Sequence, residues 1–174
     1  AATHVVVGES GKPPALSPRC HAFSGARPST SRSAAIVRQN FTLYAEGGFQ
    51  TLVGFSGQFA ADDGTATNAA VVRTNNGDIG CRVINGGTNK YAVTGTSSYT
   101  ARTVIKQALA VSDGAQDYAF NGSLKASGTG TPTPSGYSRL SIGGWNGSCE
   151  GDFVRRIAWW TSKLTGAGIA SITT

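Results

Sequence analysis

Short apolar stretches separated by Asn-Gly turns are the feature that most constrains what this chain can fold into. The stretches Ala69–Thr74 and Ile79–Ile84 flank the turn Asn75–Asp78, and a second pair, Asn121–Gly122, separates two further short stretches. Asn-Gly tolerates the left-handed backbone angles of the tight turns that join antiparallel strands. A series of such hairpins predicts an antiparallel β-sandwich or barrel.

Other segments continue the same spacing. They are Phe41–Glu46, Phe49–Ser56, Ser138–Gly144 and Asp152–Trp160. The longest run, Ala101–Asp113, has helical propensity, but we interpret it as a strand because strand-like stretches surround it and it ends at Ser-Asp-Gly. The sequence therefore predicts an all-β domain whose only helix is a short one at the C-terminus.

The first 34 residues differ in composition and predict an irregular N-terminal arm, residues 1–34, before a sandwich domain, residues 35–174. The arm is rich in proline, although its Val5–Val7 run could add as an edge strand. Residues 1–40 carry five basic side chains against Glu9, so +4 of the net charge of +6 lies there. We expect the arm to anchor on an acidic surface through these basic residues: Lys12, Arg19, Arg27 and Arg32.

Several partners and chemistries are not expected. No nucleic-acid-binding signature occurs, and no apolar run reaches membrane-spanning length. No two carboxylates alternate along one apolar strand, and the two histidines, His4 and His21, precede the predicted domain, so neither a glycosidase pair nor a Ser-His pair is evident. Three scattered cysteines, Cys20, Cys81 and Cys149, favour a reducing compartment. We expect a protein that is not an enzyme.

Two segments resemble one family. The segment "DYAFNGSLKAS" resembles the Y-x-x-N-G hairpin of laminin-G-like, concanavalin A-like jelly rolls, and "LSIGGWNGSCEGDFVRRIAWWTSKLTGAGIASI" resembles their closing signature. Together with "FTLYAE", the second segment is similar to domains of tailed-bacteriophage virion proteins, over about residues 36–174. The chain departs from the pattern at Thr161–Lys163, where a proline is common, and after Thr165, where the acidic partner of a capping box is missing.

The resemblance implies a role for the neighbouring tryptophans near the end of the chain. Ile157 and Trp159 should face the core, whereas Trp160 should point outward and pack near Leu164 and Ile169 of the terminal helix. A ligand-stacking role for Trp160 is the alternative.

Laminin-G-like domains often hold calcium at the rim of the sandwich, and the segment "ADDGTATN" offers three oxygen-bearing side chains for it. These are Asp62, Asp63 and Asn68, whose oxygens suit Ca²⁺. An Asx turn at Asp-Gly, without metal, is the alternative explanation. No other cofactor is expected.

A glycan site needs an exposed aromatic ring beside hydrogen-bonding side chains. Trp145 with Asn146 in "GGWNGSCEG", and Tyr137 in "TPSGYS", are the candidates. A tryptophan in a glycine-rich loop could equally pack on a neighbouring subunit. Both explanations remain open.

Two functions follow from these features. The first is a structural protein of the virion surface, assembled in the host cytoplasm as a homo-oligomer. It would decorate the capsid and dock through its arm on the major capsid protein or neighbouring subunits. The second is a fibre adhesin module that binds a host-surface glycan. The small size, the basic arm and the absence of an obvious sugar cleft favour the first.

Overall fold

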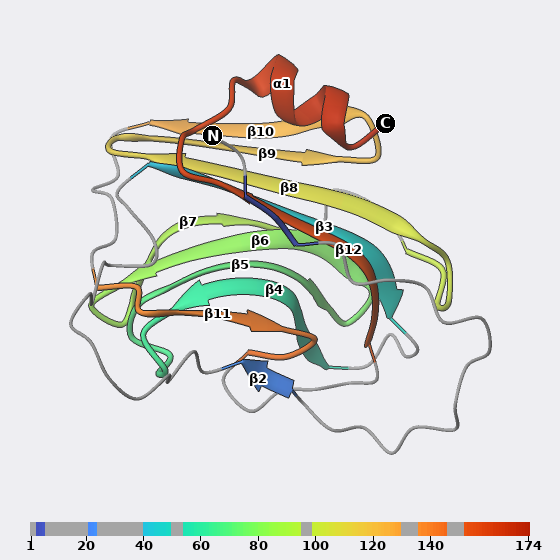
Figure 1. Ribbon diagram of the computed structural model, residues 1–174, viewed down its shortest axis with the longest axis horizontal. Coiled ribbons are helices and arrows are strands. Elements are labelled where there is room, and N and C mark those ends of the chain that lie inside the picture. The colour runs from blue at the N-terminus through green and yellow to red at the C-terminus, as the bar shows by residue number, and fades with distance from the viewer. Residues whose placement is uncertain are drawn as a thin grey trace.

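The computed structural model describes residues 3–5, 21–23, 40–49, 54–94, 99–129, 136–145 and 152–174, which form two antiparallel sheets and one helix (Figure 1). The first sheet has the order β1 (Thr3–Val5), β12 (Asp152–Trp160), β3 (Phe41–Phe49), β8 (Ile105–Ser112), β9 (Ala115–Phe120) and β10 (Ser123–Thr129). The second has the order β2 (His21–Phe23), β11 (Arg139–Ile142), β4 (Phe55–Asp62), β5 (Ala69–Asn75), β6 (Asp78–Asn85) and β7 (Thr88–Val93). The helix α1 spans Gly166–Ile172. The predicted β-sandwich with a short C-terminal helix is confirmed.

The two sheets and the helix form three layers. In Figure 1, α1 lies on the outer side of the first sheet, and the second sheet lies on the other side. Strands β4, β5 and β6 arch toward the first sheet, so their concave side faces away from it.

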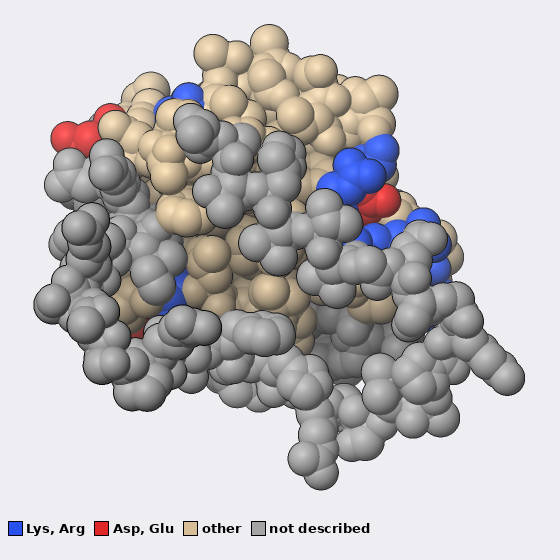
Figure 2. Space-filling view, viewed as in Figure 1, with Lys and Arg blue, Asp and Glu red and all other residues tan. Residues whose placement is uncertain are grey.

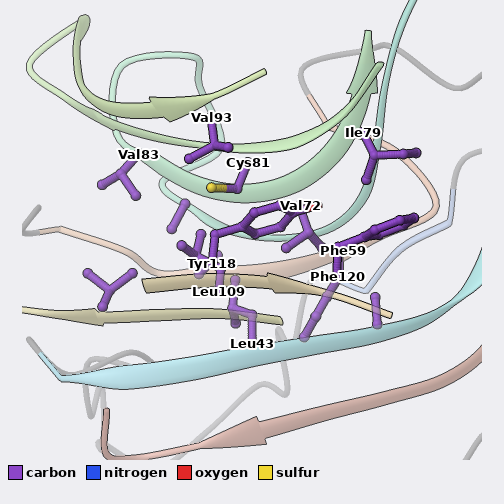
Figure 3. Packing of buried hydrophobic residues seen from close by; sticks show 14 of the residues in the cluster. Leu43, Phe59, Val72, Ile79, Cys81, Val83, Val93, Leu109, Tyr118 and Phe120 are labelled. Carbon is purple, nitrogen blue, oxygen red and sulfur yellow. The ribbon is translucent and has the colours of Figure 1, made fainter. Parts of the chain in front are cut away.

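The hydrophobic core fills the space between the sheets (Figure 3). Leu43 and Leu109 of the first sheet belong to one buried cluster with Val72 and Cys81 of the second, and none of the four has exposed surface. Side chains alternate between the faces of a strand. The inward position of Val72 therefore directs Arg73 to the outer face.

The predicted Asn-Gly hairpins are confirmed. Asn76 and Gly77 join β5 to β6 with φ values of 49° and 86°, and Asn121 and Gly122 join β9 to β10 with φ values of 43° and 78°. Two successive residues with positive φ characterise the tight turn whose twist matches that of the flanking strands.

The prediction that Phe49–Ser56 is a separate strand is wrong. β3 continues through Gly47 and Gly48 to Phe49, and Phe55 and Ser56 belong to the next strand of the described residues, β4; residues 50–53 lie outside them. The two glycines allow the close approach of neighbouring chains rather than a turn, because a Cβ on Gly47 would collide with the Phe153 carbonyl oxygen.

The run Ala101–Asp113 is a strand, as expected, but only from Ile105. Arg102 has a φ of 66°, which a regular strand does not accommodate. The Tyr99 hydroxyl, which accepts a hydrogen bond from the Phe49 amide at 2.6 Å and lies 3.0 Å from the Thr103 carbonyl oxygen, holds this segment against β3.

Within the predicted arm, the structure describes two three-residue strands. β1 pairs with β12, placing Val5 opposite Ile157, and β2 pairs with β11, placing His21 opposite Ile142. The arm thus adds an edge strand to each sheet. The boundary predicted at residue 34 lies outside the described residues, as do the predicted anchoring residues Lys12, Arg19, Arg27 and Arg32.

The neighbouring tryptophans divide between two environments, as predicted. Ile157 and Trp159 pack in the core between the sheets. Trp160 packs with Leu164 in a separate cluster, around Ile169 on the outer side of the first sheet. The second tryptophan therefore anchors the segment that leads into α1.

Thr165 caps α1, since its hydroxyl accepts a hydrogen bond from the Gly168 amide at 3.1 Å. The helix has no acidic residue in its first turn and no basic residue in its last, and Figure 2 shows an uncharged surface at the top of the molecule, where α1 lies. No helix among the described residues has both the length and the apolarity to cross a bilayer.

A chain of hydrogen bonds crosses the core between the sheets. The Tyr118 hydroxyl donates to Gln107 Oε1 at 2.6 Å, and Gln107 Nε2 donates to Gln58 Oε1 at 3.2 Å. All three residues are buried, so each bond replaces contacts with water that folding removes.

We expect Tyr118→Phe to lower the free energy of unfolding by about 1–3 kcal/mol, because it leaves Gln107 Oε1 buried without its donor. Tyr91→Phe is the matched control, since the Tyr91 hydroxyl is buried and has no hydrogen-bond partner in the described structure. Urea denaturation of the two variants measures the difference. Equal losses of stability would show that the hydrogen bond to Gln107 contributes nothing.

Candidate functional site

The outer face of the second sheet carries a cluster that is separate from the core. The register of the second sheet places Ala60, Val71 and Arg82 opposite one another in one row across β4, β5 and β6. The apolar members of the cluster are Ala60, Ala69, Val71, Ile84 and Trp145, with the partly buried Phe55 packed against them. Small side chains on the central strands leave room for larger rings above them.

Trp145 occupies such a space. Gly57 lies beneath it, and a Cβ there would come within 2.8 Å of Trp145 Cβ and 3.0 Å of Val71 Cγ2. The Trp145 and Phe55 rings have centroids 5.4 Å apart and planes tilted by 55°. Trp145 is only 5% exposed, so it lies against the sheet instead of standing out as a platform. Asn146, which was predicted to act with it, lies outside the described residues.

Two arginines meet at the ring of Phe55. The guanidinium carbon of Arg73 lies 4.8 Å from the ring centroid, and that of Arg82 lies 5.6 Å from it. Arg73 is directly opposite Gly80 on β6, and Arg82 is the next outward-facing residue of that strand, so the two arginines are diagonal neighbours. The cation–π contacts stabilise this arrangement of like charges.

Arg73 is buried, with an exposed fraction of 1%. Burial, together with the neighbouring charge of Arg82, lowers the pKa of Arg73 to about 10. The side chain is therefore still charged at neutral pH, although burial and the charge of Arg82 destabilise the charged form.

Neither arginine has a carboxylate partner among the described residues, whose ion pairs are Arg139–Asp62, Arg156–Glu46 and Lys163–Asp117. Four buried nitrogen atoms of the cluster also have no hydrogen-bond partner there: Arg73 Nε and Nη2, Arg82 Nε and Trp145 Nε1. Native proteins pair most buried polar atoms, so this concentration of unpaired donors marks a candidate binding site.

The other two aromatic candidates lie elsewhere. Tyr137 is 3% exposed and packs edge-on against Phe41 in the core, with ring centroids 5.6 Å apart, so it has little surface to offer a ligand. Trp160 contributes to the cluster beneath α1, which is the packing role expected for it from the sequence, rather than the alternative ligand-stacking role. The structure does not bring either residue to Trp145.

Asp62, a candidate calcium ligand, is fully buried and bound by protein donors. Its Oδ1 accepts hydrogen bonds from the Gly64 amide at 2.8 Å and from Arg139 Nε, and its Oδ2 accepts one from the Ser141 hydroxyl at 2.7 Å. Both carboxylate oxygens are therefore engaged.

Asp63 and Asn68 are also engaged with each other and with the loop. Asp63 Oδ1 accepts from the Thr65 amide at 2.8 Å, Asp63 Oδ2 accepts from Asn68 Nδ2 at 2.8 Å, and Asn68 Oδ1 accepts from the Gly86 amide at 3.0 Å. Burial raises the pKa of Asp63, but the hydrogen bonds from Thr65 and Asn68 outweigh it, so the pKa lies below its usual value. This is the geometry of an Asx turn. The described residues hold no group of three or more His, Cys, Asp or Glu side chains that could bind a metal ion.

Solved structures with a similar fold include several carbohydrate-binding domains. The CBM40 module of Ruminococcus gnavus IT-sialidase, bound to α2,3-sialyllactose, is 15% identical with a TM-score of 0.66, over 79% of this chain and 83% of that one. Domain 4 of AbnA, a GH43 extracellular arabinanase from Geobacillus stearothermophilus in complex with arabinotriose, is 14% identical with a TM-score of 0.62, over 80% and 68%. The leech intramolecular trans-sialidase, complexed with 2,7-anhydro-Neu5Ac, is 14% identical with a TM-score of 0.67, over 99% of this chain but 27% of the enzyme.

No protein-family model matches the chain, and no curated protein sequence matches it. At identities this low, the structural neighbours show the fold alone. They support the predicted sandwich and give no support to a laminin-G or bacteriophage link.

We expect the thermal melting temperature to be unchanged when calcium is added or when a chelator removes it. The reason is that the oxygens of Asp62, Asp63 and Asn68 already accept hydrogen bonds from protein donors. Differential scanning calorimetry in calcium and in EDTA, with magnesium as the control cation, makes the comparison. A melting temperature that rises only with calcium would mean that this loop rearranges to bind the ion.

Proposed function

We propose that this chain is a carbohydrate-binding module without catalytic activity, and that it holds a glycan on the outer face of the second sheet. The observation that carries the proposal is the gathering of unpaired donors beside two aromatic rings on that face, at Phe55, Arg73, Arg82 and Trp145. Sugars present hydroxyl groups at their edges and C–H surfaces on their faces, so donors and rings together suit them.

The structural neighbours support the same function. They include a module bound to sialyllactose and a domain bound to arabinotriose, and each match covers more than two thirds of both chains. The glycan-binding alternative predicted from the sequence is thus better supported than the capsid role.

The side chains on this face do not suit catalysis of glycoside hydrolysis. Hydrolysis of a glycosidic bond needs a pair of carboxylates on either side of it. Among the described residues of the outer face, the carboxylate of Asp62 is bound to Arg139 and Ser141, Asp78 is a single carboxylate at the start of β6, and Arg73 and Arg82 over Phe55 are cationic. Such a site binds but does not supply an acid and a nucleophile.

Capsid decoration, docking through the arm and a virion location stay predictions from the sequence resemblance. None of the structural neighbours bears on them. A fibre adhesin is compatible with the proposed module, because it would use the same glycan site.

We expect Trp145→Phe to weaken glycan binding about fivefold, the equivalent of one neutral hydrogen bond of about 1 kcal/mol, while keeping an aromatic ring over Gly57. A glycan array identifies a ligand of the whole chain, with sialyllactose, lactose and arabinotriose among its members. Titration calorimetry then compares the variants.

Trp159→Phe is the matched control, because Trp159 Nε1 is likewise buried without a partner in the described structure, but in the core. It should leave affinity unchanged. If the folded chain binds no glycan on the array, the proposed function is wrong. Equal effects of the two tryptophan variants would place the glycan elsewhere.

A further inference from the structure

The outer-face site, formed by Phe55, Arg73, Arg82 and Trp145, holds two positive charges that no described residue neutralises. Arg73 and Arg82 share the ring of Phe55, and no described carboxylate forms an ion pair with either. Asp78, at the turn between β5 and β6, favours the charged form of Arg73 only from a distance and makes no described contact with it. The site is therefore cationic.

A buried guanidinium without a counter-ion is unfavourable, because its lost hydration is not replaced. Arg73 has 1% of its surface exposed, and its Nε and Nη2 donate to nothing in the described structure. If Arg73 only filled space, an apolar side chain of similar volume would do so without burying a charge. The two charges are explained if an anion completes the site.

We infer that the site binds a carboxylate carried by an acidic sugar, and that Arg73 and Arg82 are its recognition residues. The inference rests on the proposed function and names the class of glycan. A carboxylate has two coplanar oxygens that match the fork of donors on a guanidinium, so one group can engage both arginines.

The arrangement of the remaining residues fits a sugar that bears such a group. Arg82 is half-buried and Arg73 fully buried, so the anion meets Arg82 first and gains the second charge behind it. Trp145 Nε1 is a neutral donor for a hydroxyl, and the partly buried ring of Phe55, packed against Trp145, offers apolar surface for the sugar ring. A neutral glycan would use the rings but leave both charges unpaired.

The test uses oligosaccharides in matched pairs that differ in one carboxylate. Trigalacturonate is compared with its carboxyl-reduced galactose counterpart, and sialyllactose with lactose. A sulfated lactose separates a carboxylate site from a general anion site. Titration calorimetry on the whole chain is run at low and at high salt, because screening weakens an ionic contact.

The expected result is that at least one acidic oligosaccharide binds about tenfold or more tightly than its neutral counterpart, since a charge-assisted hydrogen bond is stronger than a neutral one. Arg82→Gln should remove this preference. Arg155→Gln, at an exposed position on β12 in the other sheet, removes the same charge and should leave the preference intact.

Arg73→Met distinguishes a binding role from a structural one. It replaces a buried unpaired charge with a long apolar side chain. The melting temperature should therefore be unchanged or higher, whereas binding of the acidic oligosaccharide should be lost. If this variant fails to fold, Arg73 has a structural role and the inference is overturned for that residue. Arg82→Gln then decides whether Arg82 recognises the carboxylate.

The outcomes separate the two proposals. Equal binding of acidic and neutral members, unaffected by Arg82→Gln, would overturn the acidic-sugar inference and leave the glycan-binding function standing. A preference for the sulfated sugar over both carboxylated ones would also overturn it. Absence of binding to any oligosaccharide, here and on the array, would remove both proposals.

Discussion

The packing of the two sheets against each other decides what every strand can present to the outside. Val72 and Cys81 are opposite each other and fill the core, so the next position along β5, Arg73, and the next along β6, Arg82, must face outward. A shift of one residue in either strand would place an arginine between the sheets. Apolar packing on one face thus fixes where two positive charges meet on the other.

Much of the fold follows from local sequence. The turns at Asn76–Gly77 and Asn121–Gly122 could be predicted because few residue pairs accept two positive φ values in succession. The division of Trp159 and Trp160 between core and helix follows from strand alternation. The role of Gly47 and Gly48 could not be predicted locally, because a glycine that permits close approach and one that makes a turn look the same until the neighbouring strand is known.

The site was harder to predict than the fold, because its residues come from three strands and a loop. Trp145 could be identified from its unusual place in a glycine-rich segment, although its burial against Gly57 could not. Arg73, Arg82 and Phe55 were missed. A single arginine inside each of two adjoining apolar strands, "AAVVRT" and "IGCRVI", was the available signal. Tyr137 illustrates the opposite error, since it looks like a loop aromatic but packs in the core.

The two short strands of the arm matter for how the protein behaves in a crowded solution. By pairing with β12 and β11, β1 and β2 become the edge strands at one end of the two sheets, and β10 and β7 are the edge strands at the other end of the described sheets. A bare strand edge invites the backbone of another molecule and is a common start of aggregation. β10 has an irregular register between Leu124 and Ala126, with Lys125 at the irregularity. A bulge and a charge at that position obstruct the addition of a foreign strand, so the first sheet resists fibrous growth at its β10 edge.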